Sequence, residues 1–497
     1  MNPIQALSDL PSSGVGPLAA LVLPLLGTVF IGLFRNKPNL REAATLTTGV
    51  ALFGVILSFW PEIMAGGRPQ VTLAVPIPGI PLLLEIEPLG YLFSLVASSL
   101  WIVTSLYSIG YMRGHHEKNQ TRFYFFFAVA ISATMGVAFS GNLFTLFLFY
   151  EVLTLCTFPL VTHHQTGEAK RAGRIYLGIL LSTSVGFQLL AIIWTYSMAG
   201  TLDFRAGGIL DGHIAAGTVP ILLALFVFGV GKAAVMPFHR WLPAAMVAPT
   251  PVSALLHAVA VVKAGVFTIL KVSVFIFGPT LISETGAADI LLWVVAATII
   301  IGSLVAFTKD NLKARLAYST ISQLSYIVLG ALLANEWGII GGGMHIVMHA
   351  FGKITLFFAA GAIMVAAHKT DISQMKGLGR TMPFTFGAFF IGALSIIGLP
   401  PAGGSWSKWF LGMGTLEADQ LGLLAVLMVS SVLSLVYLLE VPVKAFFGKP
   451  TEPLHHEGVH EAPIPCLIAM GITALATIGL SIYPVPFYQL MLLVVGN

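Results

Sequence analysis

Long apolar stretches, separated by short polar segments, follow one another from residue 17 to residue 488. A helix needs about twenty mostly apolar residues to cross the hydrocarbon core of a bilayer, and windows of that length predict about fourteen membrane-spanning helices. This pattern predicts an all-α, multi-pass membrane protein. The predicted spans are 17–35, 43–61, 88–110, 123–140, 142–162, 173–197, 218–239, 248–274, 288–307, 315–334, 340–366, 383–413, 420–447 and 464–488.

The composition also fits a membrane protein. Of the 497 residues, 57% are hydrophobic and 9% are charged, whereas a soluble domain carries about 25% charged residues. The net charge of +4 is small, and no basic run with interleaved aromatic residues occurs, so nucleic-acid binding is not expected. Cys156 and Cys466 both lie in apolar stretches, which excludes a disulfide framework and a CxxC metal site.

The basic residues between the spans are distributed unevenly. Eighteen of them fall in alternate connections, whereas the other connections hold only Arg68, Arg205 and Lys271. Cytoplasmic loops carry an excess of lysine and arginine, so we expect the basic connections to face the cytoplasm. Both termini are then expected on the non-cytoplasmic side of the cell (inner) membrane. The N-terminal segment lacks the basic region of a cleaved signal peptide, so the first span is expected to remain.

Four lysines and one glutamate fall well inside predicted spans. An ionisable group near the bilayer centre costs about 2.5–3.5 kcal/mol, and it is tolerated where it faces the bundle interior, pairs, or lines a hydrated path. Each of these residues is therefore a candidate functional residue. Glu440 lies nearer a helix end, before Pro442 and Lys444, where an interfacial anchor and a proton site both fit the pattern. The five inner residues are Glu151, Lys232, Lys263, Lys353 and Lys408.

Two of these lysines lie beside helix-breaking residues. Pro237 follows Lys232, and Pro400 and Pro401 precede Lys408. Proline removes a backbone donor and frees a carbonyl, and broken helices place backbone dipoles beside transported ions. The interrupted spans are the seventh and the twelfth, which predicts two five-helix repeats, the second inverted in the membrane. The alternative is that these charges form fixed ion pairs that only pin helices together.

Histidines accompany the lysines in two spans. His257 and Lys263 share one span, and His345, His349 and Lys353 are spaced to form one stripe along another helix. Histidine titrates near neutral pH, and a lysine in a dry site can release and take up a proton. A chain of such groups at mid-membrane depth suits lateral proton transfer. The alternative for the histidines is hydrogen-bonded packing.

Other histidines have simpler interpretations. The run HEGVH at 456–460 matches the HExxH signature of zinc proteases, which needs a helix that presents both histidines on one face. Several prolines interrupt the segment 450–465, so no zinc protease site is expected. An incidental surface metal site with His455 is the alternative. The histidine pairs at 115–116 and 163–164 lie in basic connections and are expected to be solvated.

Three long segments carry a family resemblance. They are MPFHRWLPAAMVAPTPVSALLHAVAVVKAG at 236–265, HAFGKITLFFAAGAI at 349–363 and GLPPAGGSWSKWFLG at 398–412. These segments resemble the antiporter-like subunits of respiratory complex I, of multisubunit Mrp-type Na⁺/H⁺ antiporters and of membrane-bound hydrogenases. The resemblance covers most of the chain, and three motifs in the same order make it specific.

The resemblance implies a division of the chain and a set of proton-transfer residues. It implies an N-terminal three-helix segment at 1–110, five-helix repeats at 123–274 and 288–447, and a C-terminal helix at 464–497. Lys353 joins the path through its place in the histidine stripe. The residues that match the family's proton path are Glu151, Lys232, His257, Lys263, His345, His349 and Lys408.

The expected function follows from the same resemblance. The chain length and Lys408, where the medium-length complex I subunit usually has glutamate, favour the D-type Mrp subunit. We expect a proton-conducting subunit of a multisubunit Na⁺/H⁺ antiporter, a secondary transporter subunit rather than an enzyme, that works with other subunits in the bilayer. The sequence has no CxxC, P-loop or dinucleotide fingerprint, so no cofactor is expected. A proton-pumping subunit of a complex I-like or hydrogenase-linked redox complex, and a purely structural membrane subunit, are the alternatives.

Overall fold

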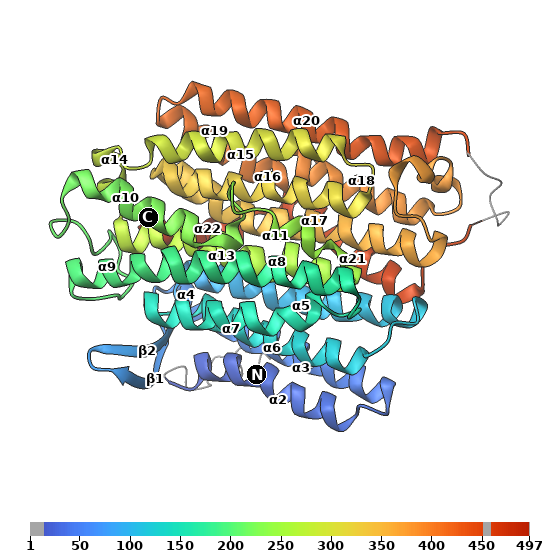
Figure 1. The fold of residues 1–497 in the computed structure, drawn as a ribbon, viewed down its shortest axis with the longest axis horizontal. Coiled ribbons are helices and arrows are strands. Elements are labelled where there is room, and N and C mark those ends of the chain that lie inside the picture. Colours follow the sequence, from blue (N-terminus) through green and yellow to red (C-terminus); the bar gives the residue numbers. More distant parts are fainter. Residues whose placement is uncertain (1–13, 451–458, 497) are drawn as a thin grey trace.

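The computed structural model describes residues 14–450 and 459–496. Its helices run roughly along the long axis of the molecule, from α2 and α3 at one edge to α20 at the opposite edge (Figure 1). Twelve helices in the described part are long and apolar enough to cross a membrane. The prediction of a multi-pass, predominantly helical membrane protein is confirmed.

The helices follow the apolar windows closely. The first half of the chain contains α2 (Gly16–Leu33), α3 (Pro38–Ser58), α4 (Trp60–Met64), α5 (Pro88–Gly114), α6 (Gln120–Ala138), α7 (Leu143–Val161), α8 (Gly167–Thr183), α9 (Leu189–Ala199), α10 (Val219–Gly229) and α11 (Trp241–Ala244). The second half contains α12 (Thr250–Ala254), α13 (Val261–Val272), α14 (Pro279–Thr285), α15 (Asp289–Thr308), α16 (Leu312–Leu333), α17 (Glu336–Ala367), α18 (Pro383–Ile397), α19 (Gly404–Glu417), α20 (Leu421–Phe447), α21 (Ile464–Ile482) and α22 (Val485–Val495).

Two segments are interrupted where the sequence places proline and glycine. α10 ends at Gly229, and α11 begins only at Trp241. α18 ends at Ile397, and α19 begins at Gly404. Neither segment is among the twelve long apolar helices. The predicted total number of spans, and the inverted repeats over 123–274 and 288–447, remain predictions.

The connection between α4 and α5 contains an antiparallel hairpin that the sequence analysis did not predict. β1 (Gln70–Ile77) pairs with β2 (Ile80–Glu85), and Gly79 supplies the positive φ of the turn, 79°. From Gln70 to Ala74, exposed and partly buried residues alternate along β1, which is the two-residue period of a strand. The hairpin is anchored to the bundle, because the Leu83 amide donates to the Thr145 hydroxyl over 3.0 Å.

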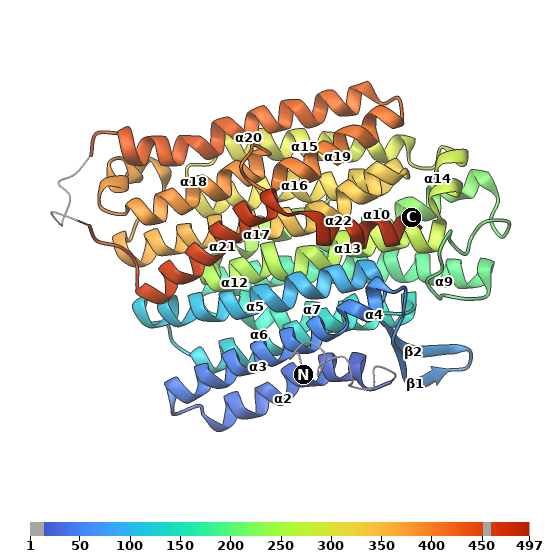
Figure 2. The same ribbon diagram turned by 180° about the vertical axis from the view of Figure 1, so that it is seen from behind.

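The last predicted span, 464–488, is two helices rather than one. α21 ends at Ile482 and α22 begins at Val485. Pro484 lies between them, and proline lacks the amide hydrogen that would continue the helix. Seen from behind, α21 and α22 lie across the face of the bundle, where both pack against α17 and α5 (Figure 2).

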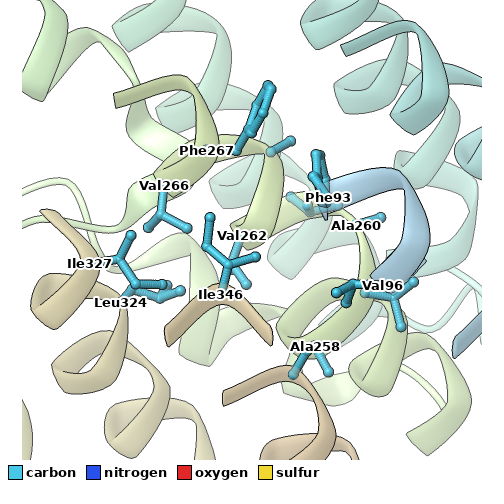
Figure 3. Close-up of a cluster of buried hydrophobic side chains, with 14 of the residues drawn as sticks. Phe93, Val96, Ala258, Ala260, Val262, Val266, Phe267, Leu324, Ile327 and Ile346 are labelled. Atoms are coloured by element: carbon cyan, nitrogen blue, oxygen red, sulfur yellow. The ribbon is translucent and has the colours of Figure 1, made fainter. Parts of the chain in front are cut away.

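Four helices form the centre of the bundle. In the span Thr250–Phe277 the most apolar window is 100% buried, and in Leu312–Leu333 it is 94% buried. Phe93 from α5, Val262 from α13, Leu324 from α16 and Ile346 from α17 belong to one buried cluster (Figure 3). Protein surrounds most of the surface of these central helices, so polar groups on their buried faces are shielded from lipid.

Candidate functional site

Most of the predicted site residues are buried in this centre. The lysines and histidines of the α12–α13 span and of α17 are at most 1% exposed, and Lys232 is fully buried. Glu151 and Lys408 are partly buried. The buried residues are Lys232, His257, Lys263, His345, His349 and Lys353.

Lys232 lies in the break between α10 and α11. Its ammonium donates to the Tyr150 carbonyl oxygen over 2.8 Å and to the Thr154 hydroxyl over 2.5 Å. It also lies 3.1 Å from the centroid of the Tyr150 ring. Gly265 of α13 packs directly on this break, since a Cβ there would overlap the backbone of Ala233. The break therefore joins Lys232 to α7 on one side and to α13 on the other.

Glu151 is the neighbour of Tyr150 on α7. Both of its carboxylate oxygens are buried and have no hydrogen-bond partner among the described residues. It forms no ion pair with Lys232 at 4.0 Å or less, although the two charges interact electrostatically. Buried polar groups in proteins are nearly always hydrogen-bonded, so this carboxylate is suited to bind a proton or water.

Lys263 of α13 makes the most direct contact between two titratable groups. Its Nζ lies 2.7 Å from Nδ1 of His349 on α17. An ammonium can only donate, and a neutral imidazole nitrogen can accept, so this geometry permits proton transfer. Nε2 of His349 has no partner among the described residues.

His257 lies in a π-helical turn, η5 (Leu255–Val259), between α12 and α13. Its ring packs on Phe357 with centroids 4.7 Å apart. Neither ring nitrogen has a partner within the described part of the chain. Single π-turns within helices often occur at functional sites.

The histidine stripe on α17 leads to α19. His345 and His349 have ring centroids 5.8 Å apart. Nδ1 of His345 lies 2.8 Å from the hydroxyl of Ser407, which is the residue before Lys408. The ring of Tyr326 stacks on His345 at 5.6 Å and lies 4.7 Å below the Lys408 ammonium.

Lys408 binds the end of a broken helix. Its ammonium donates over 3.0 Å to the Ile397 carbonyl oxygen, at the C-terminus of α18, and over 3.0 Å to the Ser431 hydroxyl on α20. The C-terminus of a helix carries partial negative charge. The helix break therefore supplies a ligand for the lysine, and Gly404 permits it because a Cβ there would overlap the Ser395 carbonyl oxygen.

Lys353 follows a different course from the other residues of its stripe. It donates over 2.8 Å to the Ser319 hydroxyl of α16. Tyr437 of α20 donates to the same hydroxyl over 3.0 Å and lies 3.0 Å from the Ser434 hydroxyl. Lys353 thus begins a separate branch of hydroxyl groups toward α20.

Hydroxyl groups that contact the site were not among the predicted site residues. Ser319, Ser407 and Ser431 each contact a candidate lysine or histidine. A signal was present in α16, where hydroxyl and amide side chains recur between 319 and 325 in an otherwise apolar span. Hydroxyls both donate and accept, so they can link titratable groups that do not touch.

Lys271 corrects the assignment of basic residues to connections. It lies in the last turn of α13 and is fully buried. Its ammonium is 3.1 Å from a Glu87 carboxylate oxygen and donates to the Ser140 carbonyl oxygen over 2.8 Å. Glu87 also caps α5 by accepting from the Leu89 and Gly90 amides. This lysine is a buried ion-pair partner, not a loop residue.

Glu440 is held by ion pairs. It contacts Arg315 and Lys444, each over 2.5 Å. Arg315 is buried, and it also donates to the Tyr437 carbonyl oxygen over 2.8 Å. These contacts favour the anchoring role of Glu440 over a role as a proton site.

Metal binding finds no support in the described residues. No group of three or more histidine, cysteine, aspartate or glutamate side chains there could hold an ion. Of the HExxH run, 456–458 lies outside the described residues, as does His455. The amide of His460 donates to the Thr381 carbonyl oxygen over 2.8 Å.

Known proteins are similar to this chain in sequence and in fold. A protein-family profile described as "NADH:quinone oxidoreductase/Mrp antiporter, TM" matches residues 140–434, a range that contains every predicted site residue. NADH-quinone oxidoreductase subunit N of Desulforudis audaxviator is 34% identical over 376 residues, which cover 74% of each chain. One Na(+)/H(+) antiporter subunit of Alkalihalophilus pseudofirmus is 30% identical over 473 residues, 88% of this chain and 57% of that protein.

Two solved structures show the same fold. A chain of the Mrp complex from Dietzia sp. DQ12-45-1b superposes with a TM-score of 0.82 and 23% identity, covering 97% of both chains. A chain of an archaeal membrane-bound sulfane sulfur reductase superposes with a TM-score of 0.83 and 24% identity, covering 96% of both chains.

Proposed function

We propose a proton-conducting role from one premise: the chain belongs to the NADH:quinone oxidoreductase/Mrp antiporter family. It is an antiporter-like membrane subunit of the kind found in Mrp antiporters and in complex I-type or hydrogenase-type complexes. Within that class we assign it to a multisubunit Na⁺/H⁺ antiporter, as a D-type subunit. It then moves protons, and other subunits of the complex complete the exchange.

The contact between Lys263 and His349 carries this proposal. Both residues are buried, and their nitrogens are 2.7 Å apart. Among the described residues, no carboxylate lies within ion-pair distance of Lys263, so its charge is not fixed by a counter-ion. Burial disfavours the charged form of a lysine that has no carboxylate beside it. Such a lysine can pass a proton to the neighbouring imidazole.

The other residues extend the path from this contact in two directions. Toward α7, Lys232 and Glu151 form the first proton site, because the break that holds Lys232 packs on α13. Toward α20, His345 and Ser407 lead to Lys408. His257 supplies protons to Lys263, and Lys353 provides a branch through hydroxyl groups. The path then crosses the molecule parallel to the membrane plane.

A redox-linked proton pump is the second candidate function. The relatives include NADH-quinone oxidoreductase subunit N at 34% identity and Hydrogenase-4 component B of Escherichia coli at 30% identity. The same proton path serves either type of complex, since electron transfer would take place in partner subunits. The identity of those subunits separates the two functions.

The orientation remains a proposal that rests on charge. The basic connections would face the cytoplasm, and both termini would lie on the other side of the cell (inner) membrane. The α2, α9, α15 and α20 helices expose large apolar side chains, which suits contact with lipid or with other subunits.

Reconstitution of the complex tests the proposed function. The complex is purified with its native partners, reconstituted into liposomes, and assayed for internal pH change after Na⁺ addition. The antiporter function predicts Na⁺-driven proton movement, and Lys232→Ala should abolish it while the complex stays assembled. Proton movement that requires an electron donor and ignores Na⁺ would instead establish the redox-linked function.

A further inference from the structure

Four histidine and glutamate side chains meet at the basic end of the molecule, where the sequence predicted solvated histidines. Oε1 of Glu117 lies 3.0 Å from Nδ1 of His115 and 3.2 Å from Nε2 of His164. Its Oε2 lies 3.8 Å from Nε2 of His163. The Glu117 side chain is only 7% exposed, and His163 is buried. Of the four histidines at 115–116 and 163–164, His116 alone is both exposed and outside this cluster.

Both ring nitrogens of His164 lie beside an oxygen that can accept a hydrogen bond. Its Nδ1 lies 3.2 Å from the Val247 carbonyl oxygen, and its Nε2 lies 3.2 Å from the Glu117 carboxylate. A carbonyl and an ionised carboxylate can only accept, so both contacts are satisfied when both ring nitrogens carry hydrogen. This geometry favours the imidazolium form of His164 beside Glu117.

The pKa shifts of the cluster agree with this assignment. The hydrogen bond that the His164 ring donates to the Glu117 carboxylate raises the pKa of His164 above its usual value. Burial alone would raise the pKa of Glu117, but hydrogen bonds and charge from His164, His115 and His163 lower it overall. Burial lowers the pKa of His163 below its usual value, which disfavours a second positive charge beside the pair. The charged groups that face the pair from neighbouring elements are Arg122, Lys313 and Lys369.

A cavity of about 220 Å³ adjoins the cluster. Its lining includes His115, Glu117 and His164 from the cluster, together with Thr250 and Lys313. A water molecule occupies about 30 Å³ in the liquid, so the cavity has room for several. Apolar residues also line the cavity, but its polar and charged side chains can hydrogen-bond water.

The cavity lies at the start of the helical span that carries part of the proposed proton path. Thr250 begins the helical span that carries His257 seven residues later, about 10 Å along a helix. Lys313 interacts electrostatically with Glu117 on one side and with His257 on the other. His257 is the member of the path whose two ring nitrogens both lack a partner in the described residues.

We propose that Glu117 and His164, with Lys313, form the proton-loading site of this protein, at the mouth of the cavity that supplies His257. His164 releases one proton to the cavity water, and it regains one from the bulk solution, so charge does not accumulate. Glu117 keeps the imidazole basic enough to capture protons at the solution pH. This inference rests on the proposed proton-conducting function.

The test uses the reconstituted complex and its pH profile. Glu117→Gln removes the charge that stabilises the His164 imidazolium, which should shift the alkaline limb of proton flux by about one pH unit toward lower pH. His164→Gln removes the titrating imidazole, so it should slow flux at alkaline pH and remove the part of the pH profile that this imidazole produces. His116→Asn is the matched control, since His116 is an exposed neighbour outside the cluster, and its profile should equal wild type.

The outcomes separate this inference from the proposed function. Size-exclusion chromatography first shows which variants assemble into the complex. If Glu117→Gln does not assemble, the test is made with His164→Gln. The loading site would be overturned if the pH profiles of the cluster variants coincided with the profile of His116→Asn. In that case, loss of flux in Lys263→Met would still support the proposed function. Normal flux in Lys263→Met would overturn the proposed function itself.

Discussion

The buried pair of Lys271 and Glu87 offers a sharp distinction between charges that stabilise the bundle and charges that move protons. The two groups lie 3.1 Å apart, with side chains 0% and 4% exposed. Unlike Lys263, Lys271 has a carboxylate as its counter-ion. We expect Lys271→Met to destabilise the protein, because it leaves the Glu87 carboxylate buried without a cation.

The size of this effect follows from the contacts. Removing one partner of a buried ion pair costs about 3–5 kcal/mol. Glu87 keeps hydrogen bonds from the Leu89 and Gly90 amides, so the lower end of this range, about 3 kcal/mol, applies to Lys271→Met. In the double variant with Glu87→Gln, no charge is left unpaired and the amide oxygen still caps α5. The double variant should therefore recover about 2 kcal/mol relative to the sum of the single variants.

The assay is a double-mutant cycle on the free energy of unfolding, measured by denaturant titration of the purified complex. Arg205→Met is the matched control, because Arg205 pairs with Asp203 at the surface over 3.8 Å with a side chain 63% exposed. An exposed pair contributes about 0–1 kcal/mol, so this variant should stay close to wild type.

Additive effects of Lys271→Met and Glu87→Gln would refute the reasoning, since they would mean that the two charges do not stabilise each other. A Lys271→Met variant as stable as the Arg205→Met control would refute it as well. Lys263→Met is the informative comparison: it leaves no counter-charge behind, so its stability should fall by much less than that of Lys271→Met.

The remaining predictions concern the path and its orientation. Lys408→Arg should assemble but lose exchange in everted vesicles, as Lys408→Ala does, because a guanidinium stays protonated; wild-type exchange would make Lys408 a fixed counter-ion. Glu151→Gln should lower exchange about a hundredfold, the scale of a lost acid–base group, and an unchanged rate would exclude Glu151. A cysteine at position 116 in place of His116 should react with an impermeant thiol reagent only from the cytoplasmic side. Cys156 and Cys466 are buried and should add little background labelling; labelling from the other side would reverse the topology.

Much of the fold could be predicted because the bilayer restricts what a sequence can do. Spans must be apolar over a fixed length, so the windows predicted the helices to within a few residues. Proline and glycine marked both breaks, and Lys232 and Lys408 lie at or just after them. The division of the last span could also have been anticipated from Pro484.

The pairing of charges could not be predicted in the same way. Lys271 and Glu87 are far apart in the sequence, and only the packing of α13 against the start of α5 brings them together. Likewise, Glu117 contacts histidines from two different connections between helices. Hydropathy reports the depth of a residue in the membrane, but it carries no information on which distant residue lies opposite.

Proton flux through the Lys263→Met complex in liposomes tests the central claim most directly. Methionine is an unbranched side chain one atom shorter than lysine and cannot bind a proton, so the 2.7 Å contact with His349 is lost as a transfer step. The account predicts an assembled complex in which flux falls to the background of empty liposomes, while the Arg205→Met complex conducts normally. Flux at the wild-type rate in Lys263→Met would contradict a proton path through the centre of this protein.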